Sequence, residues 1–161
     1  GLPNPGFAKG PCLGKDSWLL LNSTPHFNVS TTMISSAYRV NDGLPLFLLH
    51  KIKEHTELNG KKVAVLGLTF KRDADDTRES LCIKLVSILK SEFVNYMTHD
   101  PYVDNKDINE VLKDADVVII AMNHSYYEKL DFKGLLKPTT LIVDKWNMLK
   151  KDKFIFRAGE L

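Results

Sequence analysis

Four short apolar runs constrain the fold of this chain more than any other feature. They lie at residues 63–67, 93–97, 117–120 and 141–143. Stretches with helical periodicity separate them, at residues 81–89, 108–112, 126–130 and 132–136. Uninterrupted apolar runs of this length are typical of buried parallel strands. Their alternation with helices predicts an α/β fold with a doubly wound, mostly parallel sheet. We expect a last edge strand at residues 153–157.

The N-terminal part of the chain has a different pattern. Residues 1–24 are rich in glycine and proline, which predicts a turning backbone that can approach a ligand closely. Apolar residues then recur at spacings of three or four up to residue 57, with Thr24 as the expected N-cap and Pro25 at the first helical position. Gly43 and Pro45 predict a kink or two helices. We therefore divide the chain into a helical part, 1–58, and an α/β part, 59–161.

Composition excludes several classes of protein. The 161 residues include 22 Lys+Arg and 20 Asp+Glu, interspersed to a net charge of +2, so nothing indicates nucleic acid or a membrane surface as a partner. Cys12 and Cys82 are too few for a disulfide framework and fit a reducing compartment. No apolar run is long enough to span a membrane. The five histidines lack metal-ligand spacing. We expect a soluble, cytoplasmic chain without a bound metal.

The sequence GPCLGKD at residues 10–16 places a thiol between glycines. The ammonium group of Lys15 would favour the thiolate of Cys12, which is the nucleophilic form. The carboxylate of Asp16 could direct water or move a proton. The alternative is a Gly-Pro turn that holds a small buried cysteine beside a surface charge pair.

A charged loop, residues 67–80, follows the first predicted strand. It contains Gly67 but no GxGxxG, so a dinucleotide pyrophosphate is not expected in this crevice. Lys71, Arg72 and Arg78 alternate with acids and could bind phosphate. The alternative is a solvated loop with internal ion pairs. In a doubly wound sheet, residues 69–79, 99–101, 122–125 and 144–147 would surround one crevice.

Several segments, in this order, resemble the UDP-glucose/GDP-mannose dehydrogenase family. They are GPCLGKD at 10–16, RVND with Pro45 at 39–45, LGLTFK through DTRES at 66–80, HDP at 99–101, and the strand ends at 116–121 and 144–147. The likeness covers essentially the whole chain. It implies a C-terminal portion that lacks the N-terminal NAD-binding Rossmann domain. Residues 1–58 would end the central dimerisation domain, and 59–161 would form the Rossmann-like UDP-sugar-binding domain.

The resemblance also implies a reaction. Members oxidise C6 of a UDP-hexose or UDP-N-acetylhexosamine to the uronic acid, reducing two NAD+ per sugar, for polysaccharide precursor synthesis. Cys12 would form a thiohemiacetal and then a thioester, which water assisted by Asp16 would hydrolyse, while Lys15 would lie near the cofactor. The implied substrate-binding residues are Pro5, Gly6, Phe7, Ala8, Lys9, Phe70, Lys71 and Trp146. The implied cofactor-binding residues are Cys12, Lys15 and Arg78.

Two positions depart from the family pattern. Lys9 stands where the family usually has glycine, and could crowd the sugar or contact a substituent on it. No arginine follows Asp144 on the last strand end, although Trp146 could stack on an apolar face.

The expected partners are a UDP-sugar, an N-terminal NAD-binding domain and a second copy of the chain, bound through the helix at 25–57. Without the NAD-binding domain, we expect no hydride transfer. The alternatives are a non-catalytic nucleotide-sugar-binding or oligomerisation module and a flavodoxin-like regulatory domain. The lack of an acidic phospho-acceptor cluster at the end of the first strand counts against the regulatory domain.

Overall fold

A parallel sheet forms the centre of the C-terminal part of the chain. The computed structural model describes residues 6–27, 29–104, 106–149 and 155–157. The strands are β1 (Lys62–Leu66), β2 (Asn95–His99), β3 (Val117–Ile120), β4 (Leu141–Asp144) and β5 (Ile155–Arg157). Their order is β2-β1-β3-β4-β5, and all neighbouring strands are parallel. The predicted α/β sheet is confirmed, with β5 at its edge.

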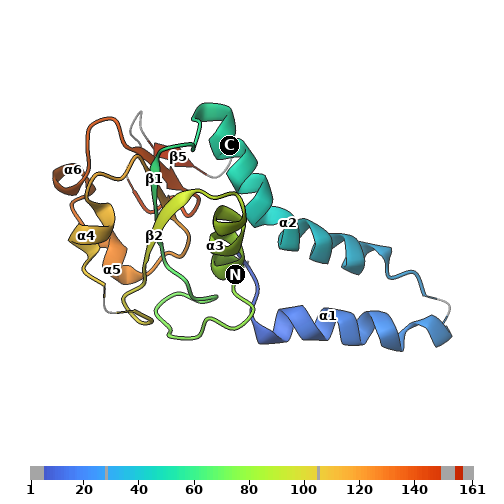
Figure 1. Ribbon diagram of the computed structural model, residues 1–161. Coiled ribbons are helices and arrows are strands. Elements are labelled where there is room, and N and C mark those ends of the chain that lie inside the picture. Colours follow the sequence, from blue (N-terminus) through green and yellow to red (C-terminus); the bar gives the residue numbers. More distant parts are fainter. Residues whose placement is uncertain (1–5, 28, 105, 150–154, 158–161) are drawn as a thin grey trace.

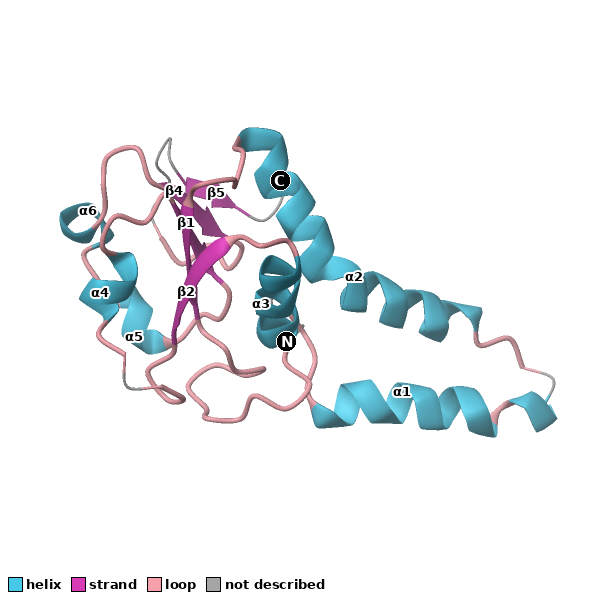
Figure 2. Ribbon diagram, in the orientation of Figure 1, coloured by secondary structure: helices cyan, strands magenta, loops and turns pink. Residues whose placement is uncertain are grey.

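Helices cover both faces of this sheet. The C-terminal half of α2 (Thr32–His55) and α3 (Leu81–Ser91) pack on one face, against Val63, Val65, Val117, Ile119 and Val143. On the other face, α4 (Ile108–Leu112), α5 (Ser125–Glu128) and α6 (Phe132–Leu135) pack against Ala64, Leu66, Val118, Ile120 and Ile142. Alternate residues of a strand point to opposite faces, so β1, β3 and β4 each contribute side chains to both faces. Figures 1 and 2 show these two layers of helices on either side of the strands.

The order of the strands places a topological switch between β1 and β3. From β1 the chain passes through α3 to β2 on one side, and α4 then leads to β3 on the other side of β1. In such sheets ligands bind beside the switch, at the carboxyl ends of the strands. We call this region the C-terminal edge; it comprises residues 67–70, 99–101, 121–125 and 145–147.

The N-terminal part forms a helical hairpin that projects from the α/β unit (Figure 1). Its elements are α1 (Pro11–Ser23), the short 3-10 helix η1 (Pro25–Phe27) and α2. The rings of Trp18 and Tyr38 meet edge to face between α1 and α2, with centroids 5.4 Å apart. The predicted helix start at Thr24 and Pro25 was wrong. The Phe27 amide donates to the Thr24 carbonyl to close η1, and α2 begins only at Thr32.

Pro45 lies inside α2, which remains one continuous helix and bends along its length (Figure 1). This agrees with the predicted kink rather than with two separate helices, since proline removes one helical hydrogen bond. Beyond Pro45, the buried Leu48, Leu49 and Ile52 join the core on the α3 face. The hairpin, from α1 to the first half of α2, instead leaves many large apolar side chains exposed: Leu13, Trp18, Leu19, Leu20, Phe27, Val29, Met33 and Val40. Within the described ranges, no helix has the length and apolar character needed to cross a membrane.

Candidate functional site

The segment 6–12 lies across the C-terminal edge of the sheet. A Cβ atom on Gly6 would fall 2.2 Å from Cη2 of Trp146, and a Cβ on Gly10 would fall 2.6 Å from Cδ2 of Phe70. Gly10 also has φ +124°, a conformation that favours glycine. These contacts place the segment against the chain that follows β4 and the chain that follows β1. The predicted residues Gly6 and Trp146 thus lie together, the predicted Phe70 lies against Gly10, and the predicted Pro5 lies outside the described residues.

Cys12 lies in the first turn of α1, where the sequence had predicted a turn. Pro11 starts the helix, as its fixed φ and missing N–H allow at this position. The Gly14 amide donates to the Gly10 carbonyl at 3.1 Å. The Cys12 side chain is a free thiol and is exposed, so the alternative of a buried structural cysteine is excluded.

Lys15 and Asp16 are exposed on α1 and form an ion pair with each other at 3.5 Å. An exposed pair of this kind contributes little to stability. Arg78 approaches the same region from the loop after β1. Hydrogen bonds to Asp76 raise the pKa of Arg78, and the charge of Cys12 raises it further. The structure therefore brings Arg78 into electrostatic range of Cys12.

The charged loop contains ion pairs, as expected for the alternative of a solvated loop with internal ion pairs. Arg72 pairs with Glu128 at 2.7 Å and Arg78 with Asp76 at 2.6 Å. Lys71 is exposed and forms no ion pair within the described part of the chain. The two arginines are thus neutralised within the protein, and Lys71 is the loop cation that remains available to an anion.

A buried Asp–His pair fixes this loop to the strand ends. The Asp100 carboxylate accepts from the amides of Leu68 (2.6 Å) and Tyr102 (2.9 Å) and from Nε2 of His124 (3.1 Å). Nδ1 of His124 accepts from the Asp73 amide at 2.9 Å, so the proton of the neutral ring is on Nε2. Burial alone would raise the pKa of Asp100, but these hydrogen bonds lower it below its ordinary value.

The Asp73 carboxylate continues the network. It accepts from the Ser125 amide at 2.8 Å and from the Tyr102 hydroxyl at 3.1 Å. Asp73 has φ 52°, in the left-handed region that aspartate tolerates better than most residues. The loop that carries Lys71 is thereby attached to the ends of β2 and β3. Sequence reasoning grouped these segments around one crevice but did not assign His124 this function, because only the fold shows what its ring contacts.

Lys9 attaches the segment 6–12 to the helices. Its Nζ lies 2.8 Å from Oδ1 of Asp42 and 3.4 Å from Oε2 of Glu79. Asp42 also pairs with Lys84 of α3, and the Asn41 side chain donates to the Ala8 carbonyl. Burial would lower the pKa of Lys9, but the hydrogen bond and charge of Asp42 raise it. Lys9 therefore has partners within the chain, and its predicted contact with the sugar stays a prediction.

The turn after β4 is held by the buried Asp144. Its carboxylate accepts from the amides of Trp146 at 3.2 Å and Leu149 at 2.8 Å. The Trp146 indole donates to the Ala121 carbonyl at the end of β3, 3.1 Å away. Lys145 is buried, with Nζ only 3.2 Å from the centroid of the Phe7 ring. Phe7 and Trp146 are predicted site residues, whereas Lys145 is not, because nothing in the sequence marks a lysine as buried.

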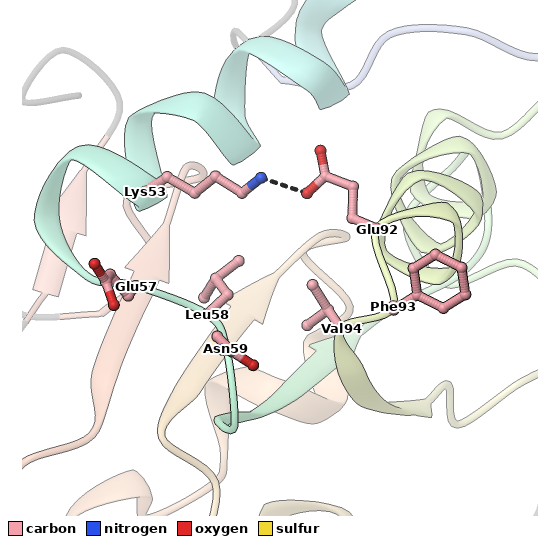
Figure 3. A pocket seen from close by; sticks show the side chains of 7 residues that line it. All are labelled: Lys53, Glu57, Leu58, Asn59, Glu92, Phe93 and Val94. Carbon is pink, nitrogen blue, oxygen red and sulfur yellow. Dashed lines mark hydrogen bonds and ion pairs between the residues drawn. The ribbon is translucent and has the colours of Figure 1, made fainter.

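A pocket of about 460 Å³ lies at the opposite edge of the sheet, before β1 and β2. Figure 3 shows Lys53 and Glu92 reaching toward each other to form an ion pair, with Leu58 and Val94 below them. The pocket lining contains no cysteine, serine or histidine. Across the described ranges, no cluster of three or more His, Cys, Asp and Glu side chains could hold a metal. Cys12 and the exposed Lys71 instead lie on segments next to the C-terminal edge: Cys12 follows Gly10, which packs on Phe70, and Lys71 follows Phe70 directly.

A family model and several known proteins are similar to this chain. The model of the UDP binding domain of the UDP-glucose/GDP-mannose dehydrogenase family matches residues 64–151. The chain is 31% identical to UDP-N-acetyl-D-mannosamine dehydrogenase from Methanocaldococcus jannaschii and 33% identical to that from Pyrococcus horikoshii. These alignments cover 93% and 92% of this chain but only 36% and 38% of the relatives. The chain thus spans less than two fifths of their length.

Solved structures agree in fold. The structure of UDP-D-ManNAc dehydrogenase from P. horikoshii superposes with a TM-score of 0.82 at 29% identity, covering 99% of this chain and 40% of that one. NDP-N-acetyl-D-galactosaminuronic acid dehydrogenase from Methanosarcina mazei gives a TM-score of 0.84 at 25% identity, with the same shares of the two chains covered. Both similarities extend beyond the sheet to the helical part.

Proposed function

Because the chain belongs to the UDP-glucose/GDP-mannose dehydrogenase family, we propose that it is the sugar-nucleotide-binding part of an NAD-dependent dehydrogenase. The enzyme would oxidise C6 of a UDP-hexose or UDP-N-acetylhexosamine to the uronic acid. One observation carries the proposal: the segment that leads to Cys12 lies on the C-terminal edge, with Gly10 against Phe70 and Gly6 against Trp146. A sugar nucleotide bound at this edge would therefore lie beside the cysteine segment.

The substrate would be held by residues of this edge. Lys71 would supply positive charge, because the neighbouring arginines are already paired with acids. Phe70 and Trp146 would offer ring faces, and the backbone of residues 6–9 would cover the sugar. The names of the relatives, which include UDP-N-acetyl-D-mannosamine dehydrogenases, support a UDP-linked sugar as the substrate class.

Cys12 would carry the covalent step. Its thiolate would add to the C6 aldehyde carbon, and the resulting thiohemiacetal would retain the intermediate on the enzyme. After the second oxidation, water would hydrolyse the thioester, releasing the carboxylate and restoring the thiol. Asp16, four residues further along α1, would accept the proton of this water.

NAD would be held mainly outside these 161 residues. The connection from β1 to α3 is not a glycine-rich cradle: Gly67 packs so closely on the chain after β3 that a Cβ would fall 2.5 Å from Cβ of Met122. The N-terminus of α3 is already capped by Ser80, whose Oγ accepts from the Cys82 amide. In contrast, the exposed Cys12, Lys15 and Arg78 would be accessible to a cofactor held by another domain. When bound, the cofactor supplies the hydride acceptor for both oxidations.

The exposed apolar side chains of the hairpin support association with other protein surfaces. We propose a homodimer formed through α2, within the predicted segment 25–57, where Met33 and Val40 are 84% and 69% exposed. Light scattering should give the mass of two chains for the unmodified protein and the mass of one chain for Val40→Glu. A single-chain mass at all concentrations would contradict the dimer. The complete enzyme would serve polysaccharide precursor synthesis.

Reconstitution tests the proposed activity. The chain is combined with the N-terminal NAD-binding portion of the P. horikoshii relative, and NADH is followed by absorbance with UDP-N-acetyl-D-mannosamine and UDP-glucose. We expect NADH formation that Cys12→Ala abolishes. Cys82→Ala is the matched control, because Cys82 is buried in α3 and should leave turnover in place. Binding of UDP without turnover, with a well-folded partner, would instead support the non-catalytic module.

A further inference from the structure

Lys145 is an unusual buried cation. Only 6% of the residue is exposed. Across the described ranges, its Nζ is the one buried side-chain nitrogen or oxygen that makes no hydrogen bond. Buried ammonium groups normally have an acidic partner or several hydrogen-bond acceptors, because removal from water is costly. The structure of the chain alone therefore does not explain why a lysine occupies this position.

Aromatic rings take the place of an anion around this group. Nζ lies 3.2 Å from the centroid of the Phe7 ring and 4.3 Å from that of Trp146. A ring face attracts a cation but satisfies none of its three hydrogen-bond donors. The neighbouring Asp144 carboxylate accepts from the amides of Trp146 and Leu149 and makes no hydrogen bond with Nζ of Lys145.

The other groups that face Lys145 carry no compensating charge. From α3, the nearest titratable group is the thiol of Cys82, which donates to the Ala121 carbonyl and whose pKa is raised by burial. From the segment 6–12, Phe7 covers the amine, while Lys9 turns to Asp42 and Glu79. Burial accordingly lowers the pKa of Lys145 to about 7.

The position of Lys145 connects this cation to the ligand-binding side of the sheet. It follows the last residue of β4 at the C-terminal edge, and its neighbour Trp146 is hydrogen-bonded to the end of β3. A sugar nucleotide bound there, as the proposed function requires, brings two phosphate charges to the same edge. Lysine binds phosphate as a compact point charge with three donors.

We propose that Lys145 binds the diphosphate of the sugar nucleotide, and that the rings of Phe7 and Trp146 hold its ammonium group until the anion replaces them. This inference rests on the proposed function and names a residue for it. The contact between Phe7 and Lys145 also couples the segment that leads to Cys12 to occupation of the nucleotide site. The alternative to phosphate binding is that Lys145 only packs between the rings of Phe7 and Trp146.

Calorimetric titration with UDP-glucose, inorganic pyrophosphate and uridine tests the proposal. We expect Lys145→Met to weaken the binding of UDP-glucose and of pyrophosphate about tenfold or more, and to change the affinity for uridine by less than about twofold. Lys145→Arg should retain most of the affinity, because it keeps the charge. Lys90→Met, at the solvent-exposed end of α3, is the matched control and should change nothing.

The pH dependence gives a second readout that simple packing would not produce. Above pH 7 the amine of Lys145 is increasingly neutral and must take up a proton before it binds an anion. The affinity for UDP-glucose should therefore fall between pH 7 and 9, and Lys145→Arg should remove this fall. Equal affinities of the unmodified chain and Lys145→Met, without pH dependence, would overturn the inference while leaving the proposed function intact. Failure of the unmodified chain to bind both UDP-glucose and pyrophosphate would overturn both.

Discussion

Nζ of Lys9 lies 2.8 Å from Oδ1 of Asp42, and this contact ties the segment before the cysteine to the long helix α2. Asp42 also pairs with Lys84, so one carboxylate joins three separate parts of the chain. The side chain of Lys9 is 11% exposed and that of Asp42 is 30% exposed. Partial burial makes the pair more important than an ordinary surface ion pair, although solvent still reduces its energy.

Asp42→Asn should therefore destabilise the chain. We expect the free energy of unfolding at pH 7 to fall by about 1 kcal/mol in urea denaturation, because Lys9 and Lys84 lose their shared anion. Hydrogen bonds from Lys84 and Lys9 lower the pKa of Asp42 below its usual 3.8. Its contribution is thus present above about pH 4 and lost as the pH falls below that value.

Lys51→Ala is the matched control, because Lys51 and Glu54 form an ordinary pair three residues apart on the same helix. This substitution should lower the free energy of unfolding by less than about 0.5 kcal/mol. Equal effects of the two substitutions would show that Asp42 has no special connecting function.

Two glycines should respond to alanine in opposite directions. Gly43→Ala should raise the free energy of unfolding by about 0.5–1 kcal/mol, because Gly43 lies within α2 and a Cβ there meets nothing within 4 Å. Gly6→Ala should lower it, since the added carbon would fall 2.2 Å from the Trp146 ring. Thermal denaturation of both variants checks the prediction. Stabilisation by both would mean that Gly6 does not pack on Trp146.

Much of the sheet could be predicted because its strands are nearly continuous apolar runs. β1, β3 and β4 lie within one residue of the predicted limits. β2 begins two residues later than predicted, because Phe93, although apolar, lies in the turn after α3: its amide donates to the Lys90 carbonyl, and the residue is 96% exposed. Hydrophobicity alone cannot distinguish such an exposed aromatic residue from the start of a strand.

The site could be predicted only as a set of segments. The sequence grouped the strand ends correctly, since topology alone brings them together. It did not show that Pro11 begins a helix, because Gly-Pro also predicts a turn. Nor could it show that His124 is fully buried between Asp73 and Asp100, or that Lys145 lies under Phe7. Those properties depend on contacts between residues far apart in the sequence.

Loss of the His124 ring should loosen the charged loop. We expect His124→Leu to lower the free energy of unfolding by about 2–3 kcal/mol, because it leaves the Asp73 amide without its acceptor and removes one of the hydrogen bonds to the buried Asp100 carboxylate. His124→Asn, which keeps an acceptor near the Nδ1 position, should protect the Asp73 amide from hydrogen exchange better than His124→Gln. Unchanged stability and exchange in His124→Leu would contradict this account of the loop.

Lys145 should make stability depend on pH. Its pKa is about 7 in the folded chain and 10.5 in the unfolded chain. Between these values the unfolded state binds more protons, so stability rises with pH; below pH 7 both states are protonated and this contribution is constant. Between pH 7 and 9, the unmodified chain should gain ~1–2 kcal/mol relative to Lys145→Met. A difference in the free energy of unfolding that stays constant between pH 7 and 9 would show that folding does not lower the pKa of Lys145.

Binding of UDP compounds tests the central claim most directly. The melting temperature of the unmodified chain is measured with UDP, UDP-glucose, UDP-N-acetyl-D-mannosamine, GDP and NAD+. A ligand at about 100 times its Kd adds ~2.7 kcal/mol, which shifts the melting temperature of a chain of this size by several degrees. We predict stabilisation by the UDP compounds and none by NAD+. Stabilisation by NAD+ alone, or by none of the nucleotides in a cooperatively folded sample, would contradict the assignment of the C-terminal edge to a UDP-sugar.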